Sequence, residues 1–386
     1  MKVLMTADAV GGVWNYALEL CRALGRHGVE VTLATMGPRP GRPQLDDARA
    51  CRNLRLVQSD FSLEWMADPW QDVAAAGAWL QELAARVQPD VLHINGYAHA
   101  ALDIPAPRVV VAHSCVCSWW RAVHGRDAPA EWDRYRQHVR RGVHAADAVV
   151  APTRAMLAEL GALYGMPRNG RVIPNGMDMD MLPLGARDAF GRYGRERKLP
   201  GTMVLAAGRL WDPAKNMDTL ARAAARIRVP VHVAGSATGP GGASHPLHGL
   251  HHLGALSSGA LRHWMGRASV FVHPALYEPF GLAPLEAARA RTALVLSDLP
   301  SLREVWGDTA TYFPAREVEA LADAVNRLID DPLLMRNRAE AAWRRARAMT
   351  GRAMGAAYHA LYRELQTDAR AGTTATAPAT TETTEP

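Results

Sequence analysis

The chain has 386 residues, 48% of them hydrophobic, which is enough for two α/β domains with a core in each. The formal net charge of +6 favours anionic ligands or an anionic membrane surface as partners. Four cysteines do not make a disulfide framework. The chain has no apolar run long enough to span a membrane and does not start like a signal peptide, so we expect a cytoplasmic protein.

The first half of the chain alternates apolar, β-branched runs with helical segments. Thr153 is placed to cap a helix directly after one of these runs. This alternation is typical of a parallel sheet wrapped by helices, and it predicts a first domain over residues 1–176. Its expected strands lie at 2–7, 29–35, 91–94, 108–112, 148–150 and 171–173, with a first helix at 13–24.

A second alternating set follows a break in the pattern. The polar, Gly-rich segment 177–200 predicts a linker, and a second domain is expected over 201–350. Residues 351–367 have helical spacing, whereas the Thr-, Ala- and Pro-rich segment 368–386 cannot build a core and is expected to be disordered. The strands of the second domain are expected at 203–207, 231–234, 251–253, 270–273, 293–297 and 311–313.

Two carboxylates, Glu278 and Glu286, stand eight positions apart around a turn that opens a helix predicted over 281–291. The N–H groups at such a helix start are free donors and form a ready anion site. A sugar nucleotide would use both features, because it carries a diphosphate between two hydroxyl-rich sugars. The competing interpretation is a surface helix with two solvated glutamates. The donor amides belong to Phe280, Gly281 and Leu282.

Charged and polar residues also follow the ends of other predicted strands. Arg209 and Lys215 lie six positions apart in one short loop, where a guanidinium fork and a point charge can hold a diphosphate together. His113 and Asn95 end two strands of the first domain and are expected to face a ligand there. The alternatives are two exposed basic residues among 44, and a core histidine bonded to backbone.

Paired glycines, Gly11 and Gly12, follow the first predicted strand. They would let the backbone approach a phosphate closely, and the helix after them would point its positive end at that phosphate. A plain tight turn explains the pair equally well.

The stretch from His273 to Glu286, with Pro-Phe-Gly-Leu between the glutamates, resembles the Glu-x7-Glu motif of the retaining GT-B glycosyltransferases, the group 1 or GT4-like family. The resemblance covers nearly the whole chain. It implies two Rossmann-like, doubly wound domains that face a cleft, with a C-terminal helix that crosses back onto the first domain. It also implies retaining, metal-independent transfer of a sugar from a UDP- or GDP-sugar to a hydroxyl acceptor.

The resemblance assigns a role to each candidate residue. Arg209 and Lys215 would hold the diphosphate, Glu278 the donor sugar and Glu286 the ribose. A histidine that matches His113 contacts the transferred sugar in the family. The glycine loop of Gly11 and Gly12, the amides of residues 280–282 and the base-binding stretch around Leu256 complete the donor side, and the acceptor side comprises Trp14, Asn15, Asn95 and Trp120.

Several other interpretations remain open or are set aside. Asp178 and Asp180 form an Asp-x-Asp pair, but they fall in the linker, so we expect no metal site and no cofactor. The basic segments 134–141 and 336–352 are expected to be solvated helix faces, because no nucleic-acid-binding motif accompanies them. A sugar, a lipid-linked glycan or a small molecule could be the acceptor, and a peripheral contact with the inner face of a membrane stays open. The rival functions are a sugar-nucleotide epimerase or phosphorylase, and a nucleic-acid- or membrane-binding module.

Overall fold

Seven parallel strands form the first sheet, in the order β3-β2-β1-β4-β5-β6-β7. The computed structural model describes residues 1–178, 202–239, 242 and 247–375. The strands are β1 (Lys2–Asp8), β2 (Glu30–Met36), β3 (Leu54–Gln58), β4 (Val91–Ile94), β5 (Arg108–Val111), β6 (Ala148–Ala151) and β7 (Gly170–Val172). The helices of this domain are α1 (Gly12–Gly25), α2 (Arg42–Arg49), α3 (Trp70–Val87), α4 (Val116–His124), α5 (Asp133–Ala145) and α6 (Arg154–Tyr164), with short 3-10 turns η1 (Ala98–Ala101) and η2 (Ala130–Trp132).

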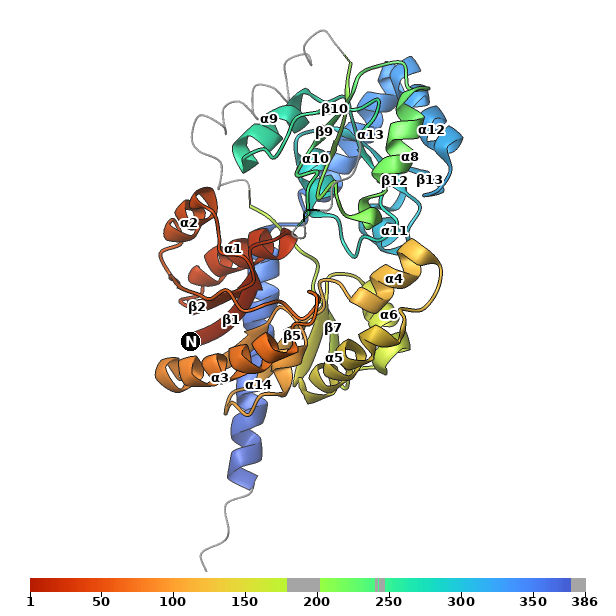
Figure 1. Ribbon diagram of the computed structural model, residues 1–386. Helices are drawn as coiled ribbons and strands as arrows, with labels where there is room; N and C mark the ends of the chain where they lie inside the picture. Colours follow the sequence, from red (N-terminus) through yellow and green to blue (C-terminus); the bar gives the residue numbers. More distant parts are fainter. Residues whose placement is uncertain (179–201, 240–241, 243–246, 376–386) are drawn as a thin grey trace, which may run out of the picture.

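The second sheet has six parallel strands, in the order β10-β9-β8-β11-β12-β13. They are β8 (Val204–Ala207), β9 (Val231–Ala234), β10 (His251–His252), β11 (Val270–His273), β12 (Ala293–Ser297) and β13 (Thr311–Phe313). Around them lie α8 (Met217–Ala224), α9 (Ser258–Arg267), α10 (Leu282–Arg289), α11 (Pro300–Trp306), α12 (Val318–Asp330) and α13 (Pro332–Ala346), with 3-10 turns η4 (Pro213–Lys215) and η5 (Gly307–Thr309). Figure 1 shows this domain above the first one.

Each sheet is buried on both faces, which explains why its strands read as continuous apolar runs. In β1, Val3 and Met5 pack into the layer beside α1, whereas Leu4 packs into the opposite layer with α3. In β8, Val204 and Leu205 divide in the same way between the two layers of the second domain. The two-domain α/β prediction is therefore confirmed.

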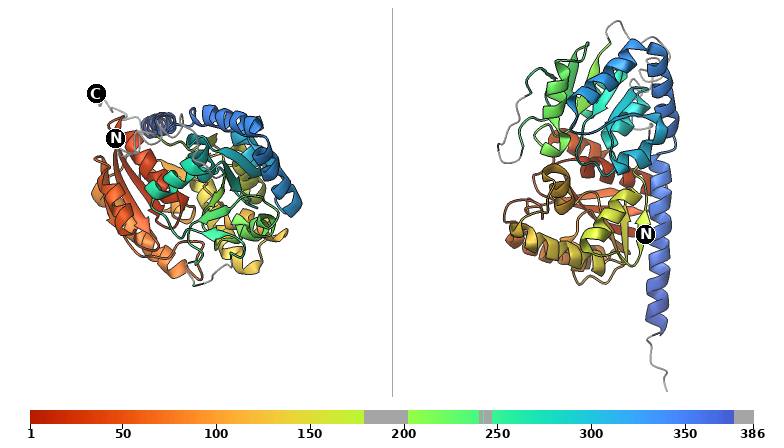
Figure 2. Two further views of the ribbon diagram at one scale, coloured as in Figure 1. Left: turned by 90° about the horizontal axis from the view of Figure 1, so that it is seen from above. Right: turned by 90° about the vertical axis from the view of Figure 1, so that its right-hand side faces the viewer.

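The chain crosses between the domains at two adjacent segments. Met177 N–H donates to the Met349 carbonyl at 3.1 Å, just before the terminal helix α14 (Gly351–Ala375) begins. A Cβ on Gly176 would lie 2.1 Å from the Thr350 carbonyl oxygen, so the close pass of the two segments requires glycine there. Helix α14 then packs on α1, and Figure 2 shows it running along the side of the first domain.

Two boundaries differ from the sequence-based expectation. Strand β3 was not predicted, because it is a half-exposed edge strand with Arg55 and Gln58 turned to solvent. The terminal helix extends past residue 367 to Ala375, since the Ala-containing segment continues the helix beyond its last core contact at Leu365. Most of the expected linker and residues 376–386 lie outside the described residues. Across the described residues, no helix combines the length and the apolar character that a membrane span requires.

Candidate active site

The candidate residues gather where the strand order of each sheet reverses. In the first sheet this point lies between β1 and β4, and in the second between β8 and β11. Ligands of doubly wound folds bind beyond the strand ends at such switch points. The residues that follow these strands are Gly11 and Gly12 after β1, Asn95 after β4, Arg209 and Lys215 after β8, and Glu278 after β11.

Lys215 and Glu278 form an ion pair across this edge of the second sheet. The Lys215 Nζ atom lies 2.9 Å from Glu278 Oε2, and both side chains are 15% exposed. His273, the last residue of β11, places its Nε2 atom 2.9 Å from the same oxygen. Sequence reasoning gave His273 no role, although its place at a strand end five residues before Glu278 is a signal that could have found it.

The carboxyl of Glu278 is ionised in this setting. Burial alone would raise its pKa, but the Lys215 ammonium and the hydrogen bond from His273 outweigh burial and hold the pKa well below its usual value. Burial lowers the pKa of His273, and Glu278 acts against that shift. The centre of the site is therefore a lysine cation and a glutamate anion within hydrogen-bond distance.

Arg209 lies at the start of the segment that follows β8 and contacts the first domain. Its Nη2 atom donates to Asp212 Oδ2 at 2.8 Å, and Asp212 Oδ1 also accepts from Trp119 Nε1 of α4 at 3.0 Å. The Arg209 guanidinium lies against Gly11, where an added Cβ would be 3.2 Å from Nη1. The structure thus brings the glycine loop and Arg209 together, and it adds Asp212 and Trp119, which the sequence analysis did not include in the site.

The start of α10 does not offer three free amides as expected. Glu278 Oε1 accepts the Gly281 N–H at 3.0 Å, so this donor already has a partner. The side chain folds back to the helix start because it stands three residues before Gly281, as an N-cap acceptor does. Within the described residues, the N–H groups of Phe280 and Leu282 have no recorded hydrogen bond, although the Phe280 side chain is in the core.

Glu286 faces a separate small cavity between the domains. This cavity has a volume of about 120 Å³ and is lined by Asn15, Glu19 and Arg22 of α1, together with Arg262 of α9 and Glu286 of α10. Burial raises the pKa of Glu286 to about 7, and the Arg262 guanidinium acts in the opposite direction. The two glutamates of the motif therefore have opposite electrostatic settings.

His113 belongs to a buried chain of hydrogen bonds that starts in α14. Asn95 Nδ2 donates to the Thr6 carbonyl at 2.7 Å, which turns Asn95 Oδ1 toward His113 Nε2 at 2.8 Å and His93 Nε2 at 3.1 Å. Both histidines then carry a proton on Nε2, so His93 Nδ1 accepts from Tyr362 Oη at 2.6 Å. Burial, followed by the nearby His93, lowers the pKa of His113 to about 3, so this imidazole is neutral.

Trp14 is a correction to the expected acceptor side. It is 1% exposed and packs between the sheet and α14, because it lies on the buried stripe of α1 with Ala17, Leu18 and Cys21. Trp120 is partly buried against the core of the first domain, and its ring lies tilted against that of His124, with the ring centres 4.5 Å apart. Leu256 is partly buried against the core of the second domain.

Several hydrogen bonds hold the two domains together around the site. Tyr277 Oη accepts the Cys115 N–H at 3.1 Å, and Thr153 Oγ1 donates to the Pro279 carbonyl at 3.0 Å. Glu304 of α11 accepts the first N–H groups of α6, from Arg154 at 2.8 Å and Ala155 at 3.0 Å. These contacts describe a closed arrangement of the domains.

The Asp-x-Asp pair of the linker is only half described. The Asp178 carboxylate lies 3.2 Å from Arg26 and accepts the Arg352 N–H at 3.3 Å, while Asp180 lies outside the described residues. Across the residues that the structure does describe, no three His, Cys, Asp or Glu side chains are grouped to hold a metal.

The two doubly wound domains and their facing switch points define the GT-B fold. The sucrose-phosphate synthase of Thermosynechococcus elongatus has the same fold, with a TM-score of 0.77 at 18% identity over 95% of this chain and all of that one (100%).

Sequence relatives identify the family. Residues 10–181 match the family model of Glycosyltransferase Family 4, and residues 201–331 match that of the glycosyl transferases group 1. A D-inositol 3-phosphate glycosyltransferase from Xylanimonas cellulosilytica is 30% identical, over 84% of this chain and 85% of the relative. A glycogen synthase from Mycobacterium tuberculosis is 26% identical, over 89% of this chain and 90% of the relative. The chain belongs to glycosyltransferase family 4, and the resemblance noted in the sequence is confirmed.

Proposed function

We propose that this glycosyltransferase moves a sugar, with retention of configuration and without a metal ion, from a nucleoside diphosphate sugar to a hydroxyl acceptor. The acceptor would be a sugar, a lipid-linked glycan or a small molecule in cytoplasmic glycan or glycoconjugate synthesis. The observation that carries the proposal is the Lys215–Glu278 pair, 2.9 Å apart and beside Arg209 at the switch point of the second sheet.

The two cations would act on the leaving group. Arg209 and Lys215 come from one loop after β8 and supply fixed positive charge where a diphosphate develops negative charge. A guanidinium fork matches two phosphate oxygens, and an ammonium adds a point charge beside them. This charge does the work that a metal ion does in other transferases, which supports metal-independent transfer.

The carboxylates would position the donor. Glu278 is ionised and accepts hydrogen bonds, so it suits hydroxyl groups of the donor sugar. Glu286, eight residues further along and facing the cavity with Asn15, would accept from the ribose. The first domain, residues 1–176, would contribute the acceptor side with Asn15, Asn95 and Trp120, and the second, residues 201–350, the donor side.

The reaction itself follows from these positions. The bond between the anomeric carbon and the diphosphate oxygen breaks, and the electron pair leaves with the nucleoside diphosphate. The acceptor hydroxyl attacks the oxocarbenium-like carbon from the same face, and its proton passes to the departing phosphate oxygen. His113, neutral and fixed by Asn95, would lie against the transferred sugar across the cleft.

Donor entry requires the domains to separate. The cavity between them has a volume of about 120 Å³, whereas sites for ligands of drug size have roughly 300–1,000 Å³. The hydrogen bonds from Thr153, Cys115 and α6 to the second domain would open and then re-form around the donor.

The test is slow donor hydrolysis by the purified full chain. Without acceptor, a panel of UDP-, GDP- and ADP-sugars is incubated with the protein, and release of nucleoside diphosphate is followed. We expect release from one donor, and EDTA should not change its rate. Release should be lost in Lys215→Met. It should be kept in Lys2→Met, which removes an exposed lysine at the first residue of β1. No release from any donor, or full activity in Lys215→Met, would contradict the proposal. An epimerase would leave the nucleotide attached, and a phosphorylase would require free phosphate.

A further inference from the structure

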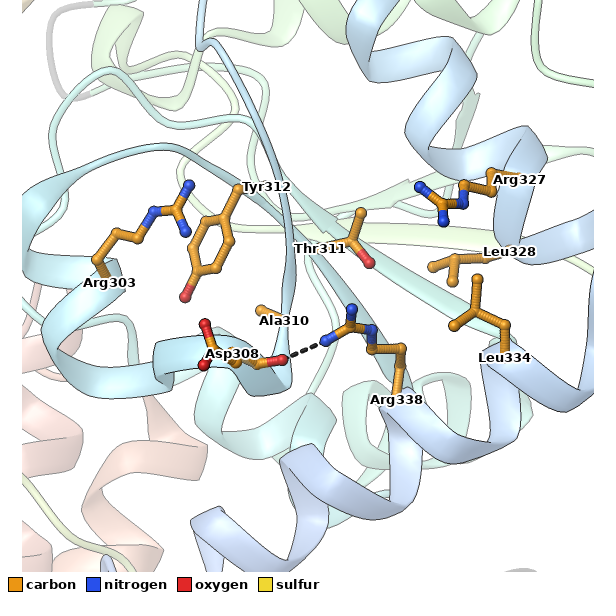
Figure 3. Close-up of a pocket in the computed structure, with 9 residues that line it drawn as sticks. All are labelled: Arg303, Asp308, Ala310, Thr311, Tyr312, Arg327, Leu328, Leu334 and Arg338. Atoms are coloured by element: carbon orange, nitrogen blue, oxygen red, sulfur yellow. Dashed lines mark hydrogen bonds between the residues drawn. The ribbon is translucent and has the colours of Figure 1, made fainter.

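One cavity of the second domain lies outside the candidate active site. It has a volume of about 360 Å³ and sits in the second domain at the open edge of the sheet, beside β13. Residues of β13, the two following helices α12 and α13, and the α11–η5 segment before it form its walls (Figure 3). None of the residues after β8 or β11 that form the candidate active site lines it.

Three arginines and one acid give this cavity a positive character. Arg303, Arg327 and Arg338 line it, and Asp308 is the carboxylate among them. Arg303 is already neutralised, because it binds Asp298 through two hydrogen bonds of 2.7 and 2.8 Å. It also lies 3.9 Å from the centre of the Tyr312 ring, which fixes it as one wall.

The other two arginines have no carboxylate partner within the part of the chain that the structure describes. Arg338 donates to the main-chain carbonyl of Asp308, which directs its guanidinium into the cavity. Arg327 comes from the last turn of α12 and points into the same space. The Thr311 hydroxyl also faces this space, between the two guanidinium groups (Figure 3).

We propose that this cavity binds a small phosphate monoester that also carries hydroxyl groups, such as a sugar phosphate. Two guanidinium forks and one hydroxyl match the three terminal oxygens of a phosphate monoester. The volume of about 360 Å³ exceeds what a phosphate group alone fills, so a further part of the ligand has room. Asp308 would accept from its hydroxyl groups, and Leu328 and Leu334 form an apolar floor.

The cavity lies against α11, a helix of the second domain that also contacts the first domain. Arg303, which walls the cavity, is followed on α11 by Glu304, which holds the first N–H groups of α6 at 2.8 and 3.0 Å. Ser301 of the same helix donates to the Glu278 carbonyl. A ligand in the cavity would therefore rest on the element that contacts both the first domain and the candidate active site.

Isothermal titration calorimetry of the full chain with ribose 5-phosphate tests the site. We expect one binding event in the wild type, about tenfold or more weaker in Arg327→Gln/Arg338→Gln, because two charge-assisted contacts are lost. Arg140→Gln/Arg141→Gln on α5 removes the same charge from an exposed face elsewhere and should bind as the wild type does. Arg209→Ala should also leave this binding unchanged, which separates the cavity from the donor site.

Three results would overturn the proposal. The first is no binding, or equal binding by the Arg327→Gln/Arg338→Gln protein. The second is loss of binding in Arg209→Ala, which would place the ligand between the domains. The third is equal affinity for inorganic phosphate, which would remove the assignment to a monoester with hydroxyl groups.

Discussion

The Lys215–Glu278 pair allows stability and catalysis to be separated by a double-mutant cycle. Both side chains are 15% exposed, and their charged atoms are 2.9 Å apart. Removing one partner leaves the other charge buried, which costs about 3–5 kcal/mol in such pairs. Glu278 keeps the Gly281 N–H and His273 as partners, so we expect the lower end, about 3 kcal/mol, for Lys215→Met.

Glu278→Gln should lose a similar amount, because the Lys215 ammonium then faces a neutral amide. The double variant Lys215→Met/Glu278→Gln has neither charge and nearly the original volume, so its loss should be about 1 kcal/mol. Since the Glu278 pKa lies below its usual value of 4.5, the stabilisation by the pair is present above pH 4.5 and is lost as the pH falls below it.

Urea unfolding of the four proteins measures the cycle, and donor hydrolysis measures function in parallel. Transfer should fall about 10²-fold or more in Lys215→Met and should stay low in the double variant, although its stability returns. If the two single losses simply add in the double variant, the residues are not an interacting pair. If activity returns together with stability, Lys215 acts on folding and the assignment to the diphosphate is refuted.

Three further predictions concern Glu286, the hydrogen-bond chain behind His113, and Glu278. Burial raises the pKa of Glu286 from 4.5 to about 7, so ionisation of this carboxyl destabilises the folded protein as the pH rises through this range. In urea unfolding, Glu286→Gln should therefore be more stable than the wild type at pH 8, by up to about 3 kcal/mol. The two proteins should be equally stable near pH 4.5. Tyr362→Phe leaves the buried Nδ1 atom of His93 without a hydrogen-bond donor, so the free energy of unfolding should fall by about 1–3 kcal/mol. Steady-state kinetics should show a lower kcat with an unchanged donor KM, because His113 is then held less firmly. Glu278→Gln should bind free nucleoside diphosphate more tightly than the wild type in calorimetry, because Lys215 no longer has a competing anion; weaker binding would show that Glu278 itself supports the diphosphate site.

The buried strands were predictable because each is apolar on both faces. The predicted bounds of 91–94, 231–234, 293–297 and 311–313 agree with β4, β9, β12 and β13. Strand β3 was not predicted, because an edge strand needs at most one apolar face and Arg55 and Gln58 interrupt its run of apolar residues. Helix α14 was predicted from its apolar stripe, but its end was not, because the stripe stops at Leu365 while the helix continues.

The sequence predicted which strand ends carry the candidate residues, but not the contacts that these residues make. Strand ends and the motif indicated Arg209, Lys215 and Glu278, because parallel strands bring their carboxyl ends to one edge. The partners depend on tertiary packing that no local pattern records. Trp119 and Asp212 are 93 residues apart and meet across the domain boundary. For Trp14 the local pattern was misleading. Its place beside the glycine loop suggested contact with a ligand, but it lies on the buried stripe of α1 and packs in the core.

The observed pairing also gives a reason for placing a glutamate beside the cations of the proposed diphosphate site. A buried ammonium without an anion is costly, so before the donor binds, Glu278, which is itself hydrogen-bonded to His273, balances the charge of Lys215. In the proposed function, a diphosphate would take over the charge of Lys215, and Glu278 would be released to accept from hydroxyl groups of the sugar attached to that diphosphate. The Gly281 N–H that Glu278 now holds would be released with it and would become a donor at the start of α10. One exchange of partners would thus assemble the cation, the amide and the carboxylate around the donor at the same moment, and a site without a donor would remain paired and inactive.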